Sequence, residues 1–238
     1  MMEKRAENGI IFEDLGLMEY GKARDLQEER FNRLVDYKRD PSGRERPDQY
    51  LLFCEHPHVY TLGKSGDEAN LLIRDDFLKK INATYYRTDR GGDITYHGPG
   101  QIVGYPILDL ELLGIGLKQY IGLLENAIIA LLEEFGIVSS HMDDATGVWL
   151  DAGHTAKARK ICAIGVRSGR YVTMHGFALN VNTDLAYFSY INPCGFQTRG
   201  VTSMEKELGA KQELRAVGSR LREILLEMFR TPGRRGSS

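Results

Sequence analysis

The chain has 238 residues, of which 42% are hydrophobic and 27% are charged. This length and balance are typical of one large globular domain that buries a core without covalent cross-links. A net charge of −2 argues against a nucleic-acid-binding chain, and three cysteines without a CxxC pair provide no disulfide framework. The N-terminus is charged and no long apolar run occurs, so we expect neither secretion nor a membrane span, and we predict a reduced, cytoplasmic protein.

Apolar periodicity predicts the order of the secondary-structure elements. Apolar residues recur at three- and four-residue steps, as in amphipathic helices, over residues 20–38, 117–135 and 211–230. The polar segment 67–80 is also compatible with a helix. Apolar runs bounded by turn residues predict strands over residues 49–54, 59–63, 83–88, 102–110, 147–150, 160–166 and 171–181. A turn at Ser168-Gly169 is expected to join the last two strands into an antiparallel pair.

These elements predict the fold class. Strands dispersed among helices, with hairpins between them, favour an α+β fold with a mixed sheet and packed helices over a doubly wound fold. We expect one domain over residues 1–230. Residues 231–238 are Gly, Ser and Arg-rich without core residues, which predicts a disordered tail.

A glycine-rich stretch stands out at residues 90–105. It contains Gly91-Gly92 and, five residues later, Gly98-Pro99-Gly100. Glycine has no Cβ, so such backbone can come close to a ligand. A hairpin that uses glycine only to turn would also explain the glycines, but Arg90 and His97 add a cation and an imidazole that such a hairpin does not need. We therefore interpret the stretch as a binding segment.

His56 and His58 are the pattern closest to a metal site. Two residues apart on a strand, both imidazoles would share one face. No second pair with ligand spacing accompanies them, so no metal site is predicted.

The three cysteines differ in their sequence settings. Cys54 and Cys162 lie in apolar strands and are expected to be core residues. Cys194 lies in the turn sequence Asn192-Pro193-Cys194-Gly195, where main-chain amides can surround an exposed thiol. It is the plausible nucleophile.

A reactive thiol needs a nearby cation or amide dipoles to stabilise the thiolate. The candidates are Lys160, His97 and His175, although each would equally suit a solvated lysine or a hydrogen-bonded core histidine. Together, a thiol, a basic partner and an amide-rich turn are the groups that acyl transfer requires.

Five ordered runs of the chain resemble a known family. They are Glu55–Gly63, Arg90–Gln101, Arg159–Val166, His175–Asn182 and Pro193–Gly195. They are similar to runs in the octanoyltransferases of lipoate biosynthesis, also called lipoyl(octanoyl) transferases, over about residues 11–208. Each run alone is weak, whereas five in order are specific. The resemblance implies a fold similar to the catalytic domain of biotin and lipoate protein ligases.

The resemblance also implies the activity. Members of the family transfer an octanoyl group from octanoyl-acyl carrier protein to a lysine of a lipoyl domain, without ATP or another cofactor. The acceptors would be lipoyl domains of 2-oxoacid dehydrogenases or the glycine cleavage H protein. No nucleic acid or membrane partner is expected.

By position, the resemblance assigns Cys194 as the thioester nucleophile and Lys160 as the residue that lowers its pKa and moves the proton. The residues that would line the acyl pocket are Arg90, Gly91, Gly92, Asp93, Ile94, Thr95, Tyr96, His97, Ala163, Ile164, Gly165, Gly176, Phe177 and Ala178. The chain departs from the family where Cys162 replaces a small apolar residue, and residues 39–48 and 151–158 look like local insertions.

A basic cluster near the predicted hairpin would suit acidic protein substrates. It consists of Lys157, Arg159, Lys160, Arg167 and Arg170. A solvated hairpin face would account equally well for these residues.

Three other functions stay open at this level. An ATP-dependent lipoate or biotin ligase would share the fold, although its glycine stretch usually reads Ser-Gly-Gly-Gly. A papain-like hydrolase needs a histidine after its cysteine, and none follows Cys194. A non-catalytic module that binds an acyl chain or its carrier would gain no covalent adduct.

Overall fold

The computed structural model describes residues 9–43, 45–154, 156–192 and 199–230. The larger of its two sheets contains β1 (Ile10–Leu17), β2 (Gln49–Glu55), β6 (Gln101–Ile107), β7 (Val148–Leu150), β8 (Arg159–Gly169), β9 (Val172–Asn180) and β10 (Gly200–Val201). The smaller sheet contains β3 (Val59–Leu62), β4 (Thr84–Arg87) and β5 (Ile94–His97). The helices are α1 (Tyr20–Arg39), α2 (Asp75–Lys80), α3 (Leu110–Leu113), α4 (Leu117–Glu134), α5 (Met204–Leu208) and α6 (Leu214–Arg230). Two 3₁₀ helices, η1 (Glu68–Asn70) and η2 (Leu185–Tyr190), lie in the connections.

Both sheets are mixed. The larger has the order β1-β2-β6-β9-β8-β10, with β7 also paired to β8, and the smaller has the order β4-β3-β5. In the larger sheet β1 runs parallel to β2 and β10 parallel to β8, whereas the central pairs are antiparallel. The predicted α+β fold with a mixed sheet is thus confirmed.

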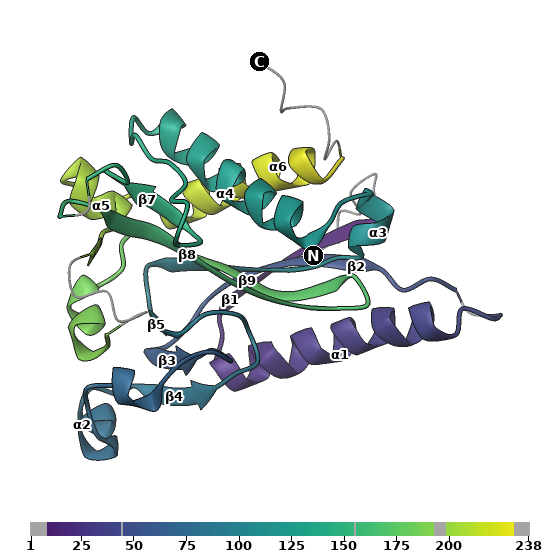
Figure 1. Cartoon of the computed structure of the whole chain (residues 1–238), viewed down its shortest axis with the longest axis horizontal. Helices are drawn as coiled ribbons and strands as arrows, with labels where there is room; N and C mark the ends of the chain where they lie inside the picture. Colours follow the sequence, from purple (N-terminus) through teal and green to yellow (C-terminus); the bar gives the residue numbers. More distant parts are fainter. Residues whose placement is uncertain (1–8, 44, 155, 193–198, 231–238) are drawn as a thin grey trace.

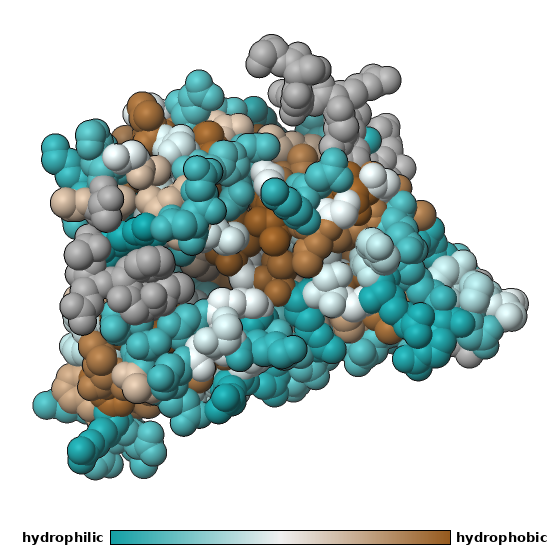
Figure 2. Space-filling model, in the orientation of Figure 1, coloured by the Kyte–Doolittle hydropathy of each residue, from teal (hydrophilic) through white to brown (hydrophobic). Residues whose placement is uncertain are grey.

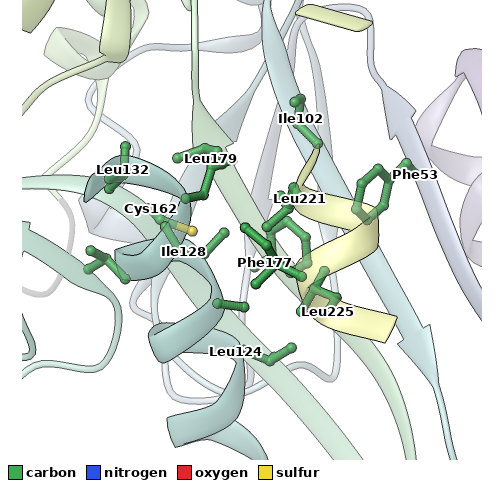
Figure 3. Close-up of a cluster of buried hydrophobic side chains, with 14 of the residues drawn as sticks. Phe53, Ile102, Leu124, Ile128, Leu132, Cys162, Phe177, Leu179, Leu221 and Leu225 are labelled. Atoms are coloured by element: carbon green, nitrogen blue, oxygen red, sulfur yellow. The ribbon is translucent and has the colours of Figure 1, made fainter. Parts of the chain in front are cut away.

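Helices cover both faces of the larger sheet (Figure 1). On one face, α4 and α6 pack over β8 and β9, and Figure 3 shows Cys162 and Leu179 of these strands meeting Ile128 of α4 and Leu221 of α6. On the other face, α1 contributes Ala23, Phe31 and Leu34, all buried. Because it is covered on both sides, β9 is buried along its whole length.

The smaller sheet has a core of its own. Tyr60, Leu62, Ile94 and Tyr96 are buried there together with Leu78 of α2. Aromatic side chains of η2 pack against this cluster. The smaller sheet is thereby fixed beside the α1-covered side of the larger one, at the left of Figure 1.

The predicted helices and strands agree with the observed elements, with shifts at their ends. The helix predicted over residues 211–230 begins at Leu214, because the Glu213 carboxylate accepts a hydrogen bond from the Ala216 amide (2.6 Å) and so caps the first turn. The strands predicted over residues 49–54 and 59–63 are correct in place but lie in different sheets. The strands β1, β5 and β10 were not predicted.

The predicted turn between β8 and β9 was wrong. The two strands stay paired as far as Gly169 and Val172, so the turn consists of Arg170 and Tyr171. Both have left-handed backbone, with φ of 50° and 62°. Two such residues match the right-handed twist of a tight hairpin.

Two predictions about the organisation of the chain, the single domain and the C-terminal tail, are not tested by the structure. The single domain expected over residues 1–230 stays a prediction, and the expected tail at residues 231–238 lies outside the described residues. Within the described part of the chain, no helix combines the length and apolar character that a bilayer crossing requires.

We expect two glycine substitutions to change stability in opposite directions. A Cβ at Gly176 would lie 2.1 Å from the carbonyl oxygen of Gly104 on the neighbouring strand, so Gly176→Ala forces the sheet apart and should cost about 1–3 kcal/mol. A Cβ at Gly122, within α4, meets nothing within 4 Å, and Gly122→Ala should stabilise by up to about 1 kcal/mol. Urea unfolding of both variants measures the free energies, and a stabilising Gly176→Ala would contradict the close approach.

Candidate active site

A cavity of about 380 Å³ lies where the smaller sheet meets the α1-covered side of the larger sheet. Val103, Ala163 and Ala178, from β6, β8 and β9, lie opposite one another in the strand register and form its apolar wall. Gly165 and Gly176 line the same wall without side chains. Small residues on three adjacent strands therefore leave room for a ligand. The volume of the cavity lies in the range of pockets that bind small molecules.

Apolar residues also reach the molecular surface. In the orientation of Figure 1, hydrophobic side chains gather near the middle of the face, between α4 and α1 (Figure 2). Contiguous apolar surface of this kind is commonly functional.

Arg90 binds the glycine-rich loop from within. Its side chain is 8% exposed, and its guanidinium donates to the carbonyl oxygens of Thr61 (2.6 Å), Asp93 (2.7 Å) and Gly91 (3.0 Å). The Gly91 amide in turn donates to the Val166 carbonyl of β8 (2.9 Å). The arginine lies on the cavity, as expected, and it also connects the loop to the smaller sheet.

His97 is buried at one end of the cavity. Its Nδ1 is 2.8 Å from Oε1 of Gln101, and its Nε2 is 3.3 Å from Oγ1 of Thr61. Burial lowers the pKa of His97 to about 3, so the imidazole is neutral near pH 7. A neutral imidazole argues against His97 as the cation that stabilises a thiolate.

His175 lies on the cavity with unusual backbone. Its φ is 57°, in the left-handed region, and its side chain is 2% exposed. The amide donates to Oε1 of Gln27 (3.0 Å), and Nε2 is 2.9 Å from Oδ1 of Asp89. Burial lowers the pKa of His175, an effect that Asp89 opposes. Left-handed backbone in a non-glycine residue persists where its surroundings enforce it, commonly at functional sites.

Lys160 lies at the other side of the cavity, near the edge of the larger sheet. Its Nζ donates to the Thr146 carbonyl oxygen (3.1 Å) and lies 4.7 Å from the centroid of the Trp149 ring. The Trp149 indole N–H donates to the Ala145 carbonyl oxygen (2.9 Å). The amine is therefore held between an aromatic face and a main-chain carbonyl.

The structure brings most of the expected site residues onto this one cavity. Those that line it are Arg90, Gly92, Asp93, Ile94, Thr95, His97, Lys160, Ala163, Ile164, Gly165, Gly176, Phe177 and Ala178. Gly91 does not line it and contacts β8 through its backbone. Cys194 falls outside the described residues. The roles of all these residues stay predictions.

The expectation that Tyr96 lines the acyl pocket is wrong. Its ring stacks on Tyr187 with centroids 4.9 Å apart, and its hydroxyl lies 2.7 Å from Nδ1 of His58. Residues alternate along β5, so Thr95 and His97 face the cavity while Tyr96 faces the core of the smaller sheet.

His175, named from the sequence as a candidate partner of the thiol, also lines the cavity. Several further lining residues were not predicted as site residues. They are Tyr20, Gln101, Val103, Tyr105, Asp144, Ala145, Thr146, Trp149, Asn180, Phe188, Arg199, Gly200 and Val201. Gln101 and Asn180 lie within the runs that resembled the family, which is the one signal that would have identified them. The others reach the cavity only through tertiary folding.

Cys54 and Cys162 are core residues, as predicted. Their exposed fractions are 3% and 0%, and burial raises the pKa of both thiols. Neither thiol is accessible, and neither is favoured as a thiolate.

His56 and His58 point to different parts of the fold. The two nitrogens of His56 lie 2.7 Å from the Met18 carbonyl oxygen and 2.7 Å from the Tyr105 hydroxyl, whereas His58 stacks on Tyr187. Among the described residues, no group of three or more His, Cys, Asp or Glu side chains is arranged to bind a metal.

The predicted basic cluster is divided along β8. Arg159 forms an ion pair with Glu207 (2.7 Å), and Arg167 forms one with Asp89. Eight residues of strand separate the two arginines by roughly 26 Å. They do not form one basic surface.

Comparison with known proteins identifies the class. The family model of the lipoyl protein ligase A/B catalytic domain matches residues 25–226. The fold is similar to a bi-partite lipoate protein ligase from Thermoplasma acidophilum, with a TM-score of 0.62 and 17% identity over 92% of this chain and 84% of that one. It is also similar to lipoate-protein ligase A bound with ATP, with a TM-score of 0.59 and 15% identity over 96% of this chain and 95% of that one. The chain belongs to the lipoyl protein ligase A/B catalytic domain family.

Sequence relatives narrow this class. An octanoyltransferase from Bacteroides fragilis (strain YCH46) is 56% identical over 92% of this chain and 98% of its own length. One from Parabacteroides distasonis is 51% identical over 92% and 97%, and one from Cytophaga hutchinsonii is 48% identical over 96% and 96%. The predicted resemblance to the octanoyltransferases is confirmed, and the chain is an acyltransferase with a transferase role in lipoate biosynthesis.

The family match and the sequence relatives also bear on the three other functions that the sequence left open, which are a ligase, a papain-like hydrolase and a non-catalytic module. The family match and the octanoyltransferase relatives favour an acyltransferase over a papain-like hydrolase and over a non-catalytic module. The ligase structures match at 15–17% identity and so show the fold alone.

We expect stability to fall on acidification because of His97. Its folded pKa, about 3, lies below its unfolded value of about 6.5, so between these two pH values the unfolded chain binds the extra proton. Each pH unit below about 6.5 should cost up to about 1.4 kcal/mol from this group. His97→Gln should flatten the pH dependence of the unfolding free energy between pH 4 and 6.5, measured by urea denaturation, relative to the exposed-site control His154→Gln. Equal slopes for wild type and His97→Gln would contradict a neutral, buried His97.

Proposed function

We propose that the protein transfers an octanoyl group from octanoyl-acyl carrier protein to the target lysine of a lipoyl domain, through a thioester on Cys194. The single observation that carries the proposal is one cavity with an apolar wall and, beside it, the amine of Lys160. The wall suits an acyl chain and the amine suits proton transfer. The relatives named octanoyltransferase support the acyl group.

The chemistry of the wall supports an acyl chain as the bound group. Val103, Ala163 and Ala178 present aliphatic surface, and burial keeps His97 neutral. A hydrocarbon chain that leaves water for such a wall gains about 25 cal/mol for each Å² of buried apolar area. An apolar wall gives no comparable gain to a charged substrate.

The residues that flank Cys194 support its role. The Asn192 amide donates to the Asn70 carbonyl oxygen (2.8 Å), and Arg199 lines the cavity. Cys194 is five residues from Arg199, a separation that spans at most about 18 Å of extended chain. Val201 lies opposite Lys160 in the β10–β8 register. The thiol is therefore within chain reach of both the cavity and the amine.

The proposed reaction has two half-reactions. The Cys194 thiolate attacks the carrier thioester, main-chain amides stabilise the tetrahedral oxyanion, and the carrier thiol leaves with a proton from Lys160. The neutral Lys160 then accepts a proton from the ammonium of the acceptor lysine, whose free amine attacks the acyl-enzyme. The attacking nitrogen then loses its remaining extra proton to solvent, the Cys194 thiolate leaves, and the product is an amide.

The partners in this proposal are those that the likeness to octanoyltransferases implies. The acceptors are lipoyl domains of 2-oxoacid dehydrogenases or the glycine cleavage H protein, and the reaction needs neither nucleotide nor metal. We expect the protein to act in the cytoplasm, where the buried thiols Cys54 and Cys162 stay reduced.

The first test is acyl-enzyme formation. Incubation with octanoyl-acyl carrier protein in EDTA, without nucleotide, should add one octanoyl group to the intact mass, and peptide mapping should locate it on Cys194. Cys194→Ala should lose the adduct and the transfer activity together. The matched controls Cys54→Ala and Cys162→Ala should keep both, because these thiols are buried. An adduct on Cys162, or a strict need for ATP, would contradict the proposal.

The second test concerns Lys160. Lys160→Ala should raise the pH needed to alkylate Cys194 and slow transfer by roughly 10²- to 10⁴-fold, the range for a positioned proton-transfer group. Lys160→Arg keeps the positive charge but cannot release a proton near neutral pH. Alkylation of Cys194 in this variant should stay close to wild type, while transfer to the lipoyl-domain lysine stays slow. Near-normal turnover of Lys160→Arg would show that the lysine acts only as a charge.

A further inference from the structure

The loop between α4 and β7 forms one wall of the cavity beside Lys160. Three consecutive residues of this loop, Asp144 to Thr146, line the cavity. Each contacts a different cavity residue: Asp144 forms an ion pair with Arg199 (2.6 Å), the Ala145 carbonyl accepts from Trp149, and the Thr146 carbonyl accepts from Lys160. The position of the Lys160 amine therefore depends on where this loop lies.

A single carboxylate of α4 binds both ends of this loop. Oε1 of Glu125 accepts a hydrogen bond from the Gly147 amide (2.8 Å), and Oε2 lies 3.0 Å from Nδ1 of His141. The other ring nitrogen of His141 lies 2.9 Å from Oδ1 of Asn126, the next residue of α4. The Glu125 side chain is 13% exposed and its bond to the Gly147 amide is partly buried, whereas the His141 side chain is 47% exposed.

Both supports of the loop are rigid. Glu125 is flanked on α4 by Leu124 and Ile128, which are fully buried in the core under the larger sheet. At the other end, a Cβ at Gly147 would lie 2.5 Å from the Cys162 carbonyl oxygen, and the φ of Gly147 is 122°. The loop thus meets β8 at a place where only glycine fits.

We propose that Glu125 is a positioning residue of the acyl transfer, which sets the Lys160 amine through the loop 141–147. The inference rests on the proposed function, in which Lys160 gives and takes the proton. Glu125 does not line the cavity, so it acts through the loop and not on the substrate. A displacement of about 1 Å in a positioned group can cost up to roughly 10²-fold in rate. Two contacts made by one largely shielded carboxylate are suited to prevent such a displacement.

Trp149 provides a readout of the loop that is independent of catalysis. It is the single tryptophan of the chain, and its indole N–H is bonded to the loop at Ala145. Glu125→Ala should shift the Trp149 emission to longer wavelength and increase its quenching by acrylamide. Glu125→Gln retains an oxygen that can accept from the Gly147 amide, so its emission should stay near wild type. The matched control Glu133→Ala, at an exposed position of the same helix, should leave emission unchanged.

Kinetics test the positioning role. Glu125→Ala should lower kcat roughly 10- to 100-fold and leave the KM for the lipoyl domain unchanged, with Glu125→Gln restoring most of kcat. Combined with Lys160→Ala, Glu125→Ala should cause no further loss, because the group that it positions is gone. A normal kcat in Glu125→Ala with shifted emission, or losses that multiply in the double variant, would overturn the inference.

The two proposals fail in different ways. If Lys160→Ala itself transfers at a near-normal rate, the proton-transfer role of Lys160 is wrong and the positioning role falls with it, whatever the emission of Glu125→Ala. If Lys160→Ala is slow and Glu125→Ala is not, the proposed function stands and only the positioning role is wrong. Far-UV circular dichroism of Glu125→Ala and Glu125→Gln separates both outcomes from unfolding.

Discussion

The hydrogen bonds of the buried Arg90 guanidinium hold the active-site region together. They join the Thr61 carbonyl of the smaller sheet to the carbonyls of Gly91 and Asp93 in the glycine-rich loop. Since the Gly91 amide is itself bonded to Val166 of β8, the two sheets are connected through this loop. A buried cation is costly unless its donors are satisfied, so the loop is constrained to present its carbonyls to the guanidinium. The shape of the cavity follows from that constraint.

Burial controls the chemistry of the cavity as well as its shape. The same desolvation that lowers the pKa of His97 and His175 raises the pKa of the Cys54 thiol. The imidazoles of His97 and His175 thus add no fixed positive charge beside the Arg90 guanidinium near pH 7. The amine of Lys160 lies at the sheet edge, against Trp149 and the Thr146 carbonyl. An apolar wall and an amine on one cavity suit the proposed thioester substrate, whose chain is hydrocarbon and whose thiol leaves with a proton.

The loop 141–147 links the Lys160 amine to the core of the fold. Its contacts with Lys160 and Trp149 come from backbone carbonyls, so their placement depends on the path of the chain more than on side-chain identity. That path is defined by the Glu125 carboxylate and by Gly147. The position of the Lys160 amine is thereby coupled to α4.

The sequence by itself determined the local elements and the family. The helices over residues 20–38 and 117–135 were predicted nearly to their ends because apolar periodicity reports which side of a helix is buried. The core setting of Cys54 and Cys162 was likewise visible from their apolar neighbours. Most of the expected pocket residues do line one cavity. They could be predicted because they lie in runs that resemble the family. The turn of the β8–β9 hairpin was missed, since its residues Arg170 and Tyr171 carry no glycine signal.

Only the tertiary structure decided the environment of the site residues. It showed that His97 is neutral, because burial depends on packing and not on neighbours in the chain. It turned Tyr96 away from the cavity, because the face of a strand is set by its register in the sheet. It also gave His175 its left-handed backbone beside Gln27, a residue 148 positions away. Such contacts join residues that are distant in sequence, so they cannot be predicted from local sequence patterns.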